Sequence, residues 1–127
     1  SDVCSSDLSS VGQTAVVRGR LMELLALETQ SREEADEAFV VGIFSLLDAM
    51  LGMPMPAALD LLSVPEAVSA ALLHREGHLG DLLTLVNACE SSDDDAFNRA
   101  ASNVHLTSQQ INGAHLQALA WADHIDG

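Results

Sequence analysis

The sequence contains no lysine and no tyrosine, and only 3% of its residues are aromatic. Its five cations are all arginine and stand against 19 Asp and Glu, so the formal net charge is −14 at pH 7. Affinity for nucleic acid and for anionic lipid depends on cations, so a chain this acidic is expected to bind neither. The scarcity of rings also argues against a platform on which bases stack. We therefore expect no nucleic-acid partner and no membrane partner.

Cysteine is scarce as well, since Cys4 and Cys89 are the only two and cannot build a disulfide framework. The longest apolar stretch, 38–47, is shorter than the roughly 20 residues that a membrane span needs. The N-terminus lacks the basic start and the apolar stretch of a secretory signal. These features predict a cytoplasmic location.

The 127 residues, of which 48% are apolar, suffice for one folded domain. Residues 1–10 read SDVCSSDLSS, a Ser/Asp-rich segment without periodicity that resembles a translated sequencing adaptor. We expect this segment to be disordered and non-native. The domain is predicted to occupy residues 11–127.

The abundance of Ala and Leu favours helix over strand, and the spacing of apolar residues predicts an all-α bundle of about seven helices. Gly52 with Pro54, and further on Gly77, are the expected helix breakers. The predicted helices cover 11–28, 31–51, 57–62, 63–75, 79–90, a short segment that begins within 91–95, and 107–123.

The second predicted helix is apolar on nearly every side from Phe39 onward, a pattern typical of a helix buried in the middle of a bundle. Gly42 within it is expected to let a neighbouring helix approach closely. Ser63 is predicted as an N-cap, with Pro65 inside the first turn, and Thr107 with Gln110 fits a capping box.

The strongest local candidate for metal binding is His74-Arg75-Glu76-Gly77-His78. Its H-x-E-x-H spacing differs from the H-E-x-x-H of helical zinc sites, and Gly77 breaks the helix between the two imidazoles. We therefore interpret these residues as a solvated turn. The other histidines are scattered along the chain and are interpreted as ordinary surface or half-buried residues: His105, His115 and His124.

Three further motifs also have structural interpretations. The run Asp93-Asp94-Asp95 lacks the pattern of a calcium loop and suits the positive end of a helix dipole. Cys89 has no local partner and is expected to be a small buried side chain rather than a nucleophile. Ser45 is expected to hydrogen-bond to a carbonyl one turn earlier. The residues therefore predict no catalytic, cofactor-binding or metal-ligating side chain, and an interaction or regulatory module rather than an enzyme.

Three stretches together resemble a known family: RGRLMELL at 18–25, AFVVGIFSLLDAML at 38–51, and AALLHREGHLGDLLTLVNACE at 70–90. Their order and spacing are similar to the C-terminal part of the HDOD domain, in the form found in bacterial proteins that join an EAL domain to an HDOD domain. The resemblance implies an all-α fold related to HD phosphohydrolases. It also implies a role in cyclic di-GMP signalling, with an upstream EAL domain as partner and a homo-oligomer as an open possibility.

Related HD hydrolases carry a Gly-x-x-His-Asp motif, and the resemblance implies that it lies on the helix that corresponds to 31–51. Here Gly42 is followed, after two intervening residues, by Ser45 and Leu46. Leu46 cannot bind a cation and Ser45 is a poor neutral ligand. The expected function is a non-catalytic signal-transduction module that works through protein contacts. Two alternatives remain: an unrelated helical adaptor or oligomerisation domain, and an HD-type metal-dependent phosphohydrolase.

Overall fold

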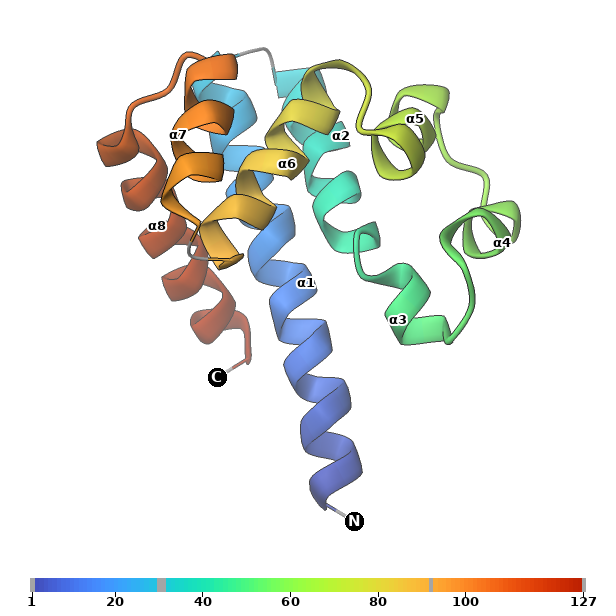
Figure 1. The fold of residues 1–127 in the computed structure, drawn as a ribbon. Helices are drawn as coiled ribbons and strands as arrows, with labels where there is room; N and C mark the ends of the chain where they lie inside the picture. The colour runs from blue at the N-terminus through green and yellow to red at the C-terminus, as the bar shows by residue number, and fades with distance from the viewer. Residues whose placement is uncertain (1, 30–31, 92, 127) are drawn as a thin grey trace.

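The structure, a computed structural model, describes the backbone of residues 2–29, 32–91 and 93–126, and the side chains of 12–29, 32–91 and 93–123. Within these residues the chain is all-α and forms eight helices without a strand (Figure 1). The helices are α1 Asp2–Thr29, α2 Arg32–Phe44, α3 Leu47–Leu51, α4 Met55–Asp60, α5 Glu66–His74, α6 Gly77–Ser91, α7 Asp94–Asn103 and α8 Ser108–Asp126.

The core lies between α1, α6 and the helices around them. The predicted apolar faces of three helices are confirmed, because the residues at helical spacing are buried or half-buried together. These residues are Val17, Leu21, Leu24 and Leu25 on α1, Leu79, Leu82, Leu83 and Val86 on α6, and Ile111, Ala114, Ala118 and Ala122 on α8. The bundle is therefore organised around α1, which packs on α2, α6 and α8.

The crossing of α1 and α2 depends on two glycines, as the prediction for Gly42 required. A Cβ atom on Gly42 would lie 2.5 Å from the Cα and N atoms of Gly19. A Cβ on Gly19 would in turn lie 3.0 Å from the carbonyl oxygen of Phe39. The two backbones are in contact here, so neither position has room for a side chain.

The predicted continuous helix over 31–51 is wrong, because the structure divides it into α2 and α3. Ser45 and Leu46 form a turn between the two helices, and Leu46 has φ −110° and ψ 10°. The hydroxyl of Ser45 donates to the carbonyl of Gly42 at 2.7 Å, so a side chain competes with the backbone for that acceptor. This division is why eight helices are found and about seven were predicted.

The expectation that this segment occupies the middle of the bundle is also wrong. Of its apolar residues from Phe39 onward only Val41 is fully buried, whereas Met50 and Leu51 are exposed. The fully buried large side chains belong mainly to α1 and α6: Leu21, Met22, Leu25, Leu82, Leu83, Leu85 and Val86. Apolar residues on every side of a helix can be buried only if neighbours surround it, and α3 packs mainly on α2 and α4.

The predicted helix caps have mixed outcomes. The capping box at Thr107 is confirmed, since its backbone N–H donates to Gln110 Oε1 at 3.0 Å and its hydroxyl accepts from Gln110 N at 3.1 Å. Asp93 caps α7 by accepting from Ala96 N at 3.1 Å. The prediction for Ser63 is wrong, because Pro65 occupies the N-cap of α5. A proline disfavours helical geometry in the residue before it, so this helix cannot begin earlier.

Helix α1 begins at Asp2, where a disordered segment over residues 1–10 was predicted (Figure 1). The segment holds no glycine or proline, and an existing helix is extended by such residues at little cost. Whether these residues are native stays a prediction, as does the boundary at residue 11. No helix within the described residues is both long enough and apolar enough to cross a membrane.

Candidate functional site

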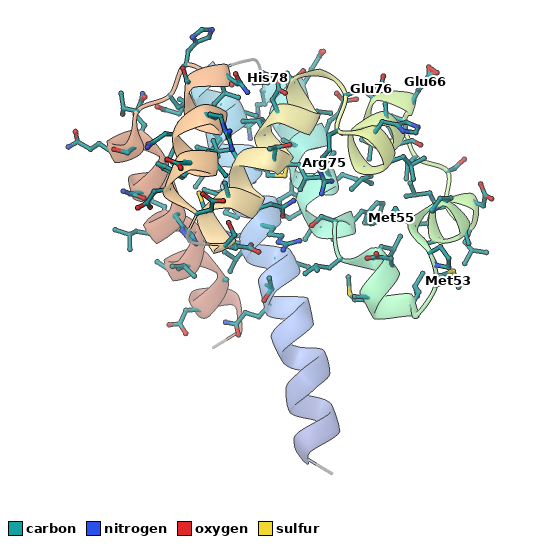
Figure 2. All side chains as sticks on the ribbon, in the orientation of Figure 1. Met53, Met55, Glu66, Arg75, Glu76 and His78 are labelled. Carbon is teal, nitrogen blue, oxygen red and sulfur yellow. The ribbon has the colours of Figure 1, made fainter. Side chains whose placement is uncertain are left out.

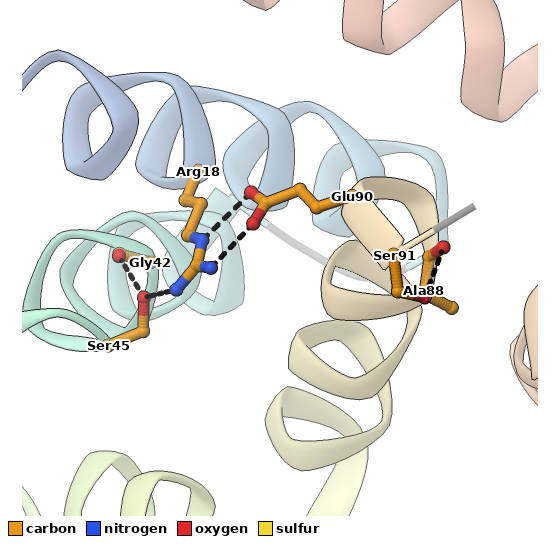
Figure 3. A network of polar contacts seen from close by, with 6 residues as sticks. All are labelled: Arg18, Gly42, Ser45, Ala88, Glu90 and Ser91. Carbon is orange, nitrogen blue, oxygen red and sulfur yellow. Dashed lines mark hydrogen bonds and ion pairs between the residues drawn. The ribbon is translucent and has the colours of Figure 1, made fainter. Parts of the chain in front are cut away.

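A polar network lies at the turn between α2 and α3, at the position that HD hydrolases are expected to use for ligands. Arg18 on α1 is at its centre (Figure 3). Its Nε donates to Glu90 Oε2 at 2.8 Å and its Nη2 donates to Glu90 Oε1 at 2.5 Å, which makes a bidentate ion pair. Its Nη1 donates to the Ser45 hydroxyl at 3.0 Å. Side chains of α1, of α6 and of the turn after α2 thus meet at one guanidinium.

Ser45 completes this network by donating its proton onward to the Gly42 carbonyl at 2.7 Å. The backward hydrogen bond predicted for this serine is confirmed, with the acceptor three residues earlier. A hydroxyl has one proton, so Ser45 can receive the Arg18 N–H only through its lone pairs. The hydroxyl is therefore engaged both as donor and as acceptor.

The Arg18–Glu90 pair is only partly exposed to solvent. The side chain of Arg18 is 15% exposed and that of Glu90 is 31% exposed, so solvent screens this pair only in part. Burial, and then the charge of Arg18, lower the pKa of Arg75 in the turn between α5 and α6. Sequence reasoning missed the Arg18–Glu90 pair, because 72 residues separate its members and no local pattern joins them.

The H-x-E-x-H stretch spans the turn between α5 and α6, where Figure 2 labels Arg75, Glu76 and His78. His74 and Glu76 are exposed, as the interpretation of a solvated turn requires, whereas His78 is half-buried. Thr29 donates its hydroxyl proton to Leu25 O at 3.1 Å, so at 2.8 Å it accepts from His78 Nε2. The two imidazoles therefore have separate environments.

The remaining sequence candidates are also separated. His105 is exposed in a turn with φ 59°, and His115 is half-buried on α8. Cys89 is half-buried and unbridged, and burial, assisted by the charge of Glu90, raises the pKa of its thiol to about 11. A thiol with this pKa is a weak nucleophile at neutral pH, in agreement with the interpretation as a packing residue. The side chains of Cys4 and His124 lie outside the described residues.

Several hollows flank these residues, among them one beside Glu90 and one beside His78. The larger, of about 580 Å³, lies between α1, α8 and the end of α6, and Gln13, Thr14, Val17, Glu90, His115 and Leu119 line it. The other, of about 290 Å³, is acidic, and Glu34, Glu37, Glu76 and His78 lie on its wall. Within the described side chains no group of three or more His, Cys, Asp or Glu converges in a way that could hold a metal ion.

Two known proteins are similar in sequence to this chain. The chain is 28% identical over 109 residues to the cyclic di-GMP phosphodiesterase CdgJ of Vibrio cholerae. It is 28% identical over 111 residues to the uncharacterized protein YuxH of Bacillus subtilis. The matched residues make up 86% and 87% of this chain but only 25% and 26% of the relatives, so the chain spans about a quarter of each relative's length.

No family model matches the chain, and no solved structure matches it. The two similarities nevertheless cover most of the chain and agree in extent. They indicate a domain related to part of each relative, one of which is named a cyclic di-GMP phosphodiesterase.

Proposed function

We propose that the chain is a non-catalytic helical module of signal transduction. It corresponds to the C-terminal part of an HDOD domain in a cytoplasmic cyclic di-GMP signalling protein that also has an EAL domain. It acts through contacts between its helices and a partner domain, and any phosphodiesterase chemistry belongs to that other domain.

The comparison with CdgJ supports the signalling role. That protein is named a cyclic di-GMP phosphodiesterase, and this chain matches a quarter of it. A match of this extent fits one domain of a multidomain protein. The motif stretches at 18–25, 38–51 and 70–90 lie in α1, α2 with α3, and α5 with α6, so they build one continuous part of the bundle.

The engagement of Ser45 is the observation that carries the non-catalytic part of the proposal. Its hydroxyl donates to Gly42 O and accepts from Arg18, and Leu46 follows it with a hydrocarbon side chain. A hydrolase of the HD type would need a metal-ligating pair at these two positions. A hydroxyl held by a cationic guanidinium is disfavoured as a ligand for a second cation.

A hydrolysis assay tests this part directly. The purified chain is incubated with cyclic di-GMP, and separately with bis(p-nitrophenyl) phosphate, in the presence of Mg²⁺ or Mn²⁺. We expect no product above the buffer control, while purified CdgJ provides the positive control with cyclic di-GMP. Turnover that a chelator abolishes and added metal restores would contradict the proposal in favour of a phosphohydrolase.

A chimera tests the signalling role. The matching region of CdgJ is replaced by this chain, and a second variant lacks the region altogether. Three rates of cyclic di-GMP hydrolysis are compared: those of intact CdgJ, the chimera and the deletion variant. We expect the rate of the chimera to be closer to that of intact CdgJ than the rate of the deletion variant is, because the inserted helices can contact the remaining domain. Equal rates in the chimera and the deletion variant, both with folded protein, would count against a role in domain contacts.

A further inference from the structure

We propose that Arg18 is a latch that holds a hinged arm of the molecule against the bundle. The arm consists of residues 46–62, which contain α3 and α4. The hinge is the turn at Ser45 and Leu46. When the contact between Arg18 and Ser45 is broken, the arm opens by local unfolding while the bundle stays folded. This inference concerns the conformation of the chain and does not depend on the proposed function.

The hinge is a true interruption of the helix. The N–H of Ser45 reaches Gly42 O at 3.4 Å, which is long for a hydrogen bond, and the Ser45 hydroxyl bonds to the same oxygen at 2.7 Å. A new helical register then begins, with Met50 N donating to Leu46 O at 2.9 Å. Because no regular backbone hydrogen bond of a continuous helix holds the junction, its geometry depends on the side chain of Ser45.

The latch connects this junction to the most deeply buried helices. Arg18 lies on α1 between the buried residues Val17 and Gly19, and its bidentate bond to Glu90 ties it to the end of α6 (Figure 3). Three N–H groups of the same guanidinium remain, and one of them, on Nη1, donates to Ser45 at 3.0 Å. A planar guanidinium with one edge fixed can direct its remaining donors with little loss of freedom.

The arm itself is weakly anchored. Only Ala58 and Leu59 of α4 are buried, and α3 has no buried residue. Neither helix has a side-chain N-cap bond. Several large apolar side chains on the arm are exposed to solvent: Met50, Leu51, Leu61 and Leu62. Segments with few buried contacts open at low free energy, so one latch can control such an arm.

Hydrogen exchange measured residue by residue tests the latch with a matched pair of variants. The amides of Met50, Gly52 and Ala58 report on the arm, because their hydrogen bonds lie within it. We expect Arg18→Gln to accelerate exchange at these amides on the order of tenfold, as the loss of a charge-assisted hydrogen bond predicts. Exchange at buried amides of α6 should change far less.

Arg20→Gln is the control. Arg20 lies on the same helix and pairs with Glu23 on that helix at 2.8 Å, while its guanidinium packs over Trp121 on α8. Its loss removes the same charge without a contact to the arm. Equal exchange of the arm in the Arg18→Gln and Arg20→Gln variants, or exchange no faster than in the unaltered chain, would overturn the latch.

Ser45→Ala provides a second route if Arg18→Gln fails to fold. This variant keeps the Arg18–Glu90 pair but removes the acceptor on the hinge. We expect accelerated exchange on the arm again, and the double variant should exchange no faster on the arm than Ser45→Ala alone, because Ser45→Ala already removes the Arg18 contact together with the hydrogen bond to Gly42 O. Independent, multiplicative effects of the two substitutions would contradict a shared latch.

Discussion

The centre of the bundle and the 46–62 arm contain the same kinds of side chain but differ in how far these side chains are buried. At the centre, Leu82 and Leu83 on α6 are fully buried, whereas Leu61 and Leu62 at the end of the arm are 66% and 41% exposed. Both regions are rich in Leu, Met and Ala. The difference lies in neighbours, because α1 and α6 have helices on several sides while α3 packs mainly on α2 and α4. Apolar composition therefore makes burial possible, and the arrangement of helices decides whether it happens.

The largest expected effect contrasts the two regions directly. Leu83→Ala should lower the free energy of unfolding by about 3 kcal/mol, because it leaves a cavity among fully buried side chains. Leu61→Ala should cost less than about 0.5 kcal/mol. Urea denaturation followed by circular dichroism measures both. Similar losses for the two variants would show that the arm is part of the stabilising core.

The contact between Gly42 and Gly19, where α2 crosses α1, gives a second contrast. Gly42→Ala should destabilise the protein by about 2 kcal/mol, since the new methyl group would meet the backbone of Gly19 rather than a movable side chain. Gly113→Ala in α8 is the matched control, because a Cβ there meets no atom within 4 Å. That change should stabilise the protein by about 0.5 kcal/mol through helix propensity. Thermal unfolding of both variants checks the opposite signs.

Helix capping gives a smaller contrast, between Asp93 at the start of α7 and Ser63 in the connection that follows the arm. Asp93→Ala should cost about 1 kcal/mol, because it removes the side-chain acceptor of the Ala96 N–H at the start of α7. Ser63→Ala should change stability by no more than about 0.5 kcal/mol, because α5 is capped by Pro65 instead. A clear loss of stability in the Ser63 variant would restore the capping role predicted from its sequence.

The smallest expected effect concerns the thiol of Cys89, and it tests the partial burial of this side chain in the bundle. Its pKa is raised from the ordinary 9.0 to about 11, so the native state keeps a proton that the unfolded state has lost between those two pH values. Stability from this group is complete below pH 9 and declines as pH rises toward about 11. In a Cys4→Ser background, alkylation of the native protein at pH 9 should be slower than alkylation of the urea-unfolded protein. Equal rates would indicate an exposed, unperturbed thiol.

Local patterns predicted much of the fold. The buried faces of α1, α6 and α8 follow from apolar spacing, and the Thr107 capping box from a four-residue motif, because the interactions involved lie within one or two helical turns. The break at Ser45 was missed, since a run of apolar residues on both sides suggests a continuous helix. The backward bond of that serine was anticipated, yet its consequence for the helix was not.

The candidate site shows the same division. The sequence could indicate that Ser45 and Leu46 are poor ligands, since this follows from the chemistry of the two side chains alone. It could not indicate that Arg18 holds Ser45 and Glu90, because these residues lie 27 and 72 residues from Arg18 and no local pattern joins them. Only the packing of α1 between α2 and α6 brings the three together.

The sequence by itself determined that the described chain is helical, that its charge is strongly negative, and which faces of its long helices are apolar, because these properties depend on residue type and local spacing. The tertiary structure decided which apolar faces find neighbours, where the second long segment divides, and which of the few arginines pairs with which carboxylate. These outcomes depend on contacts between residues far apart in the chain, and such contacts form only when the helices have packed.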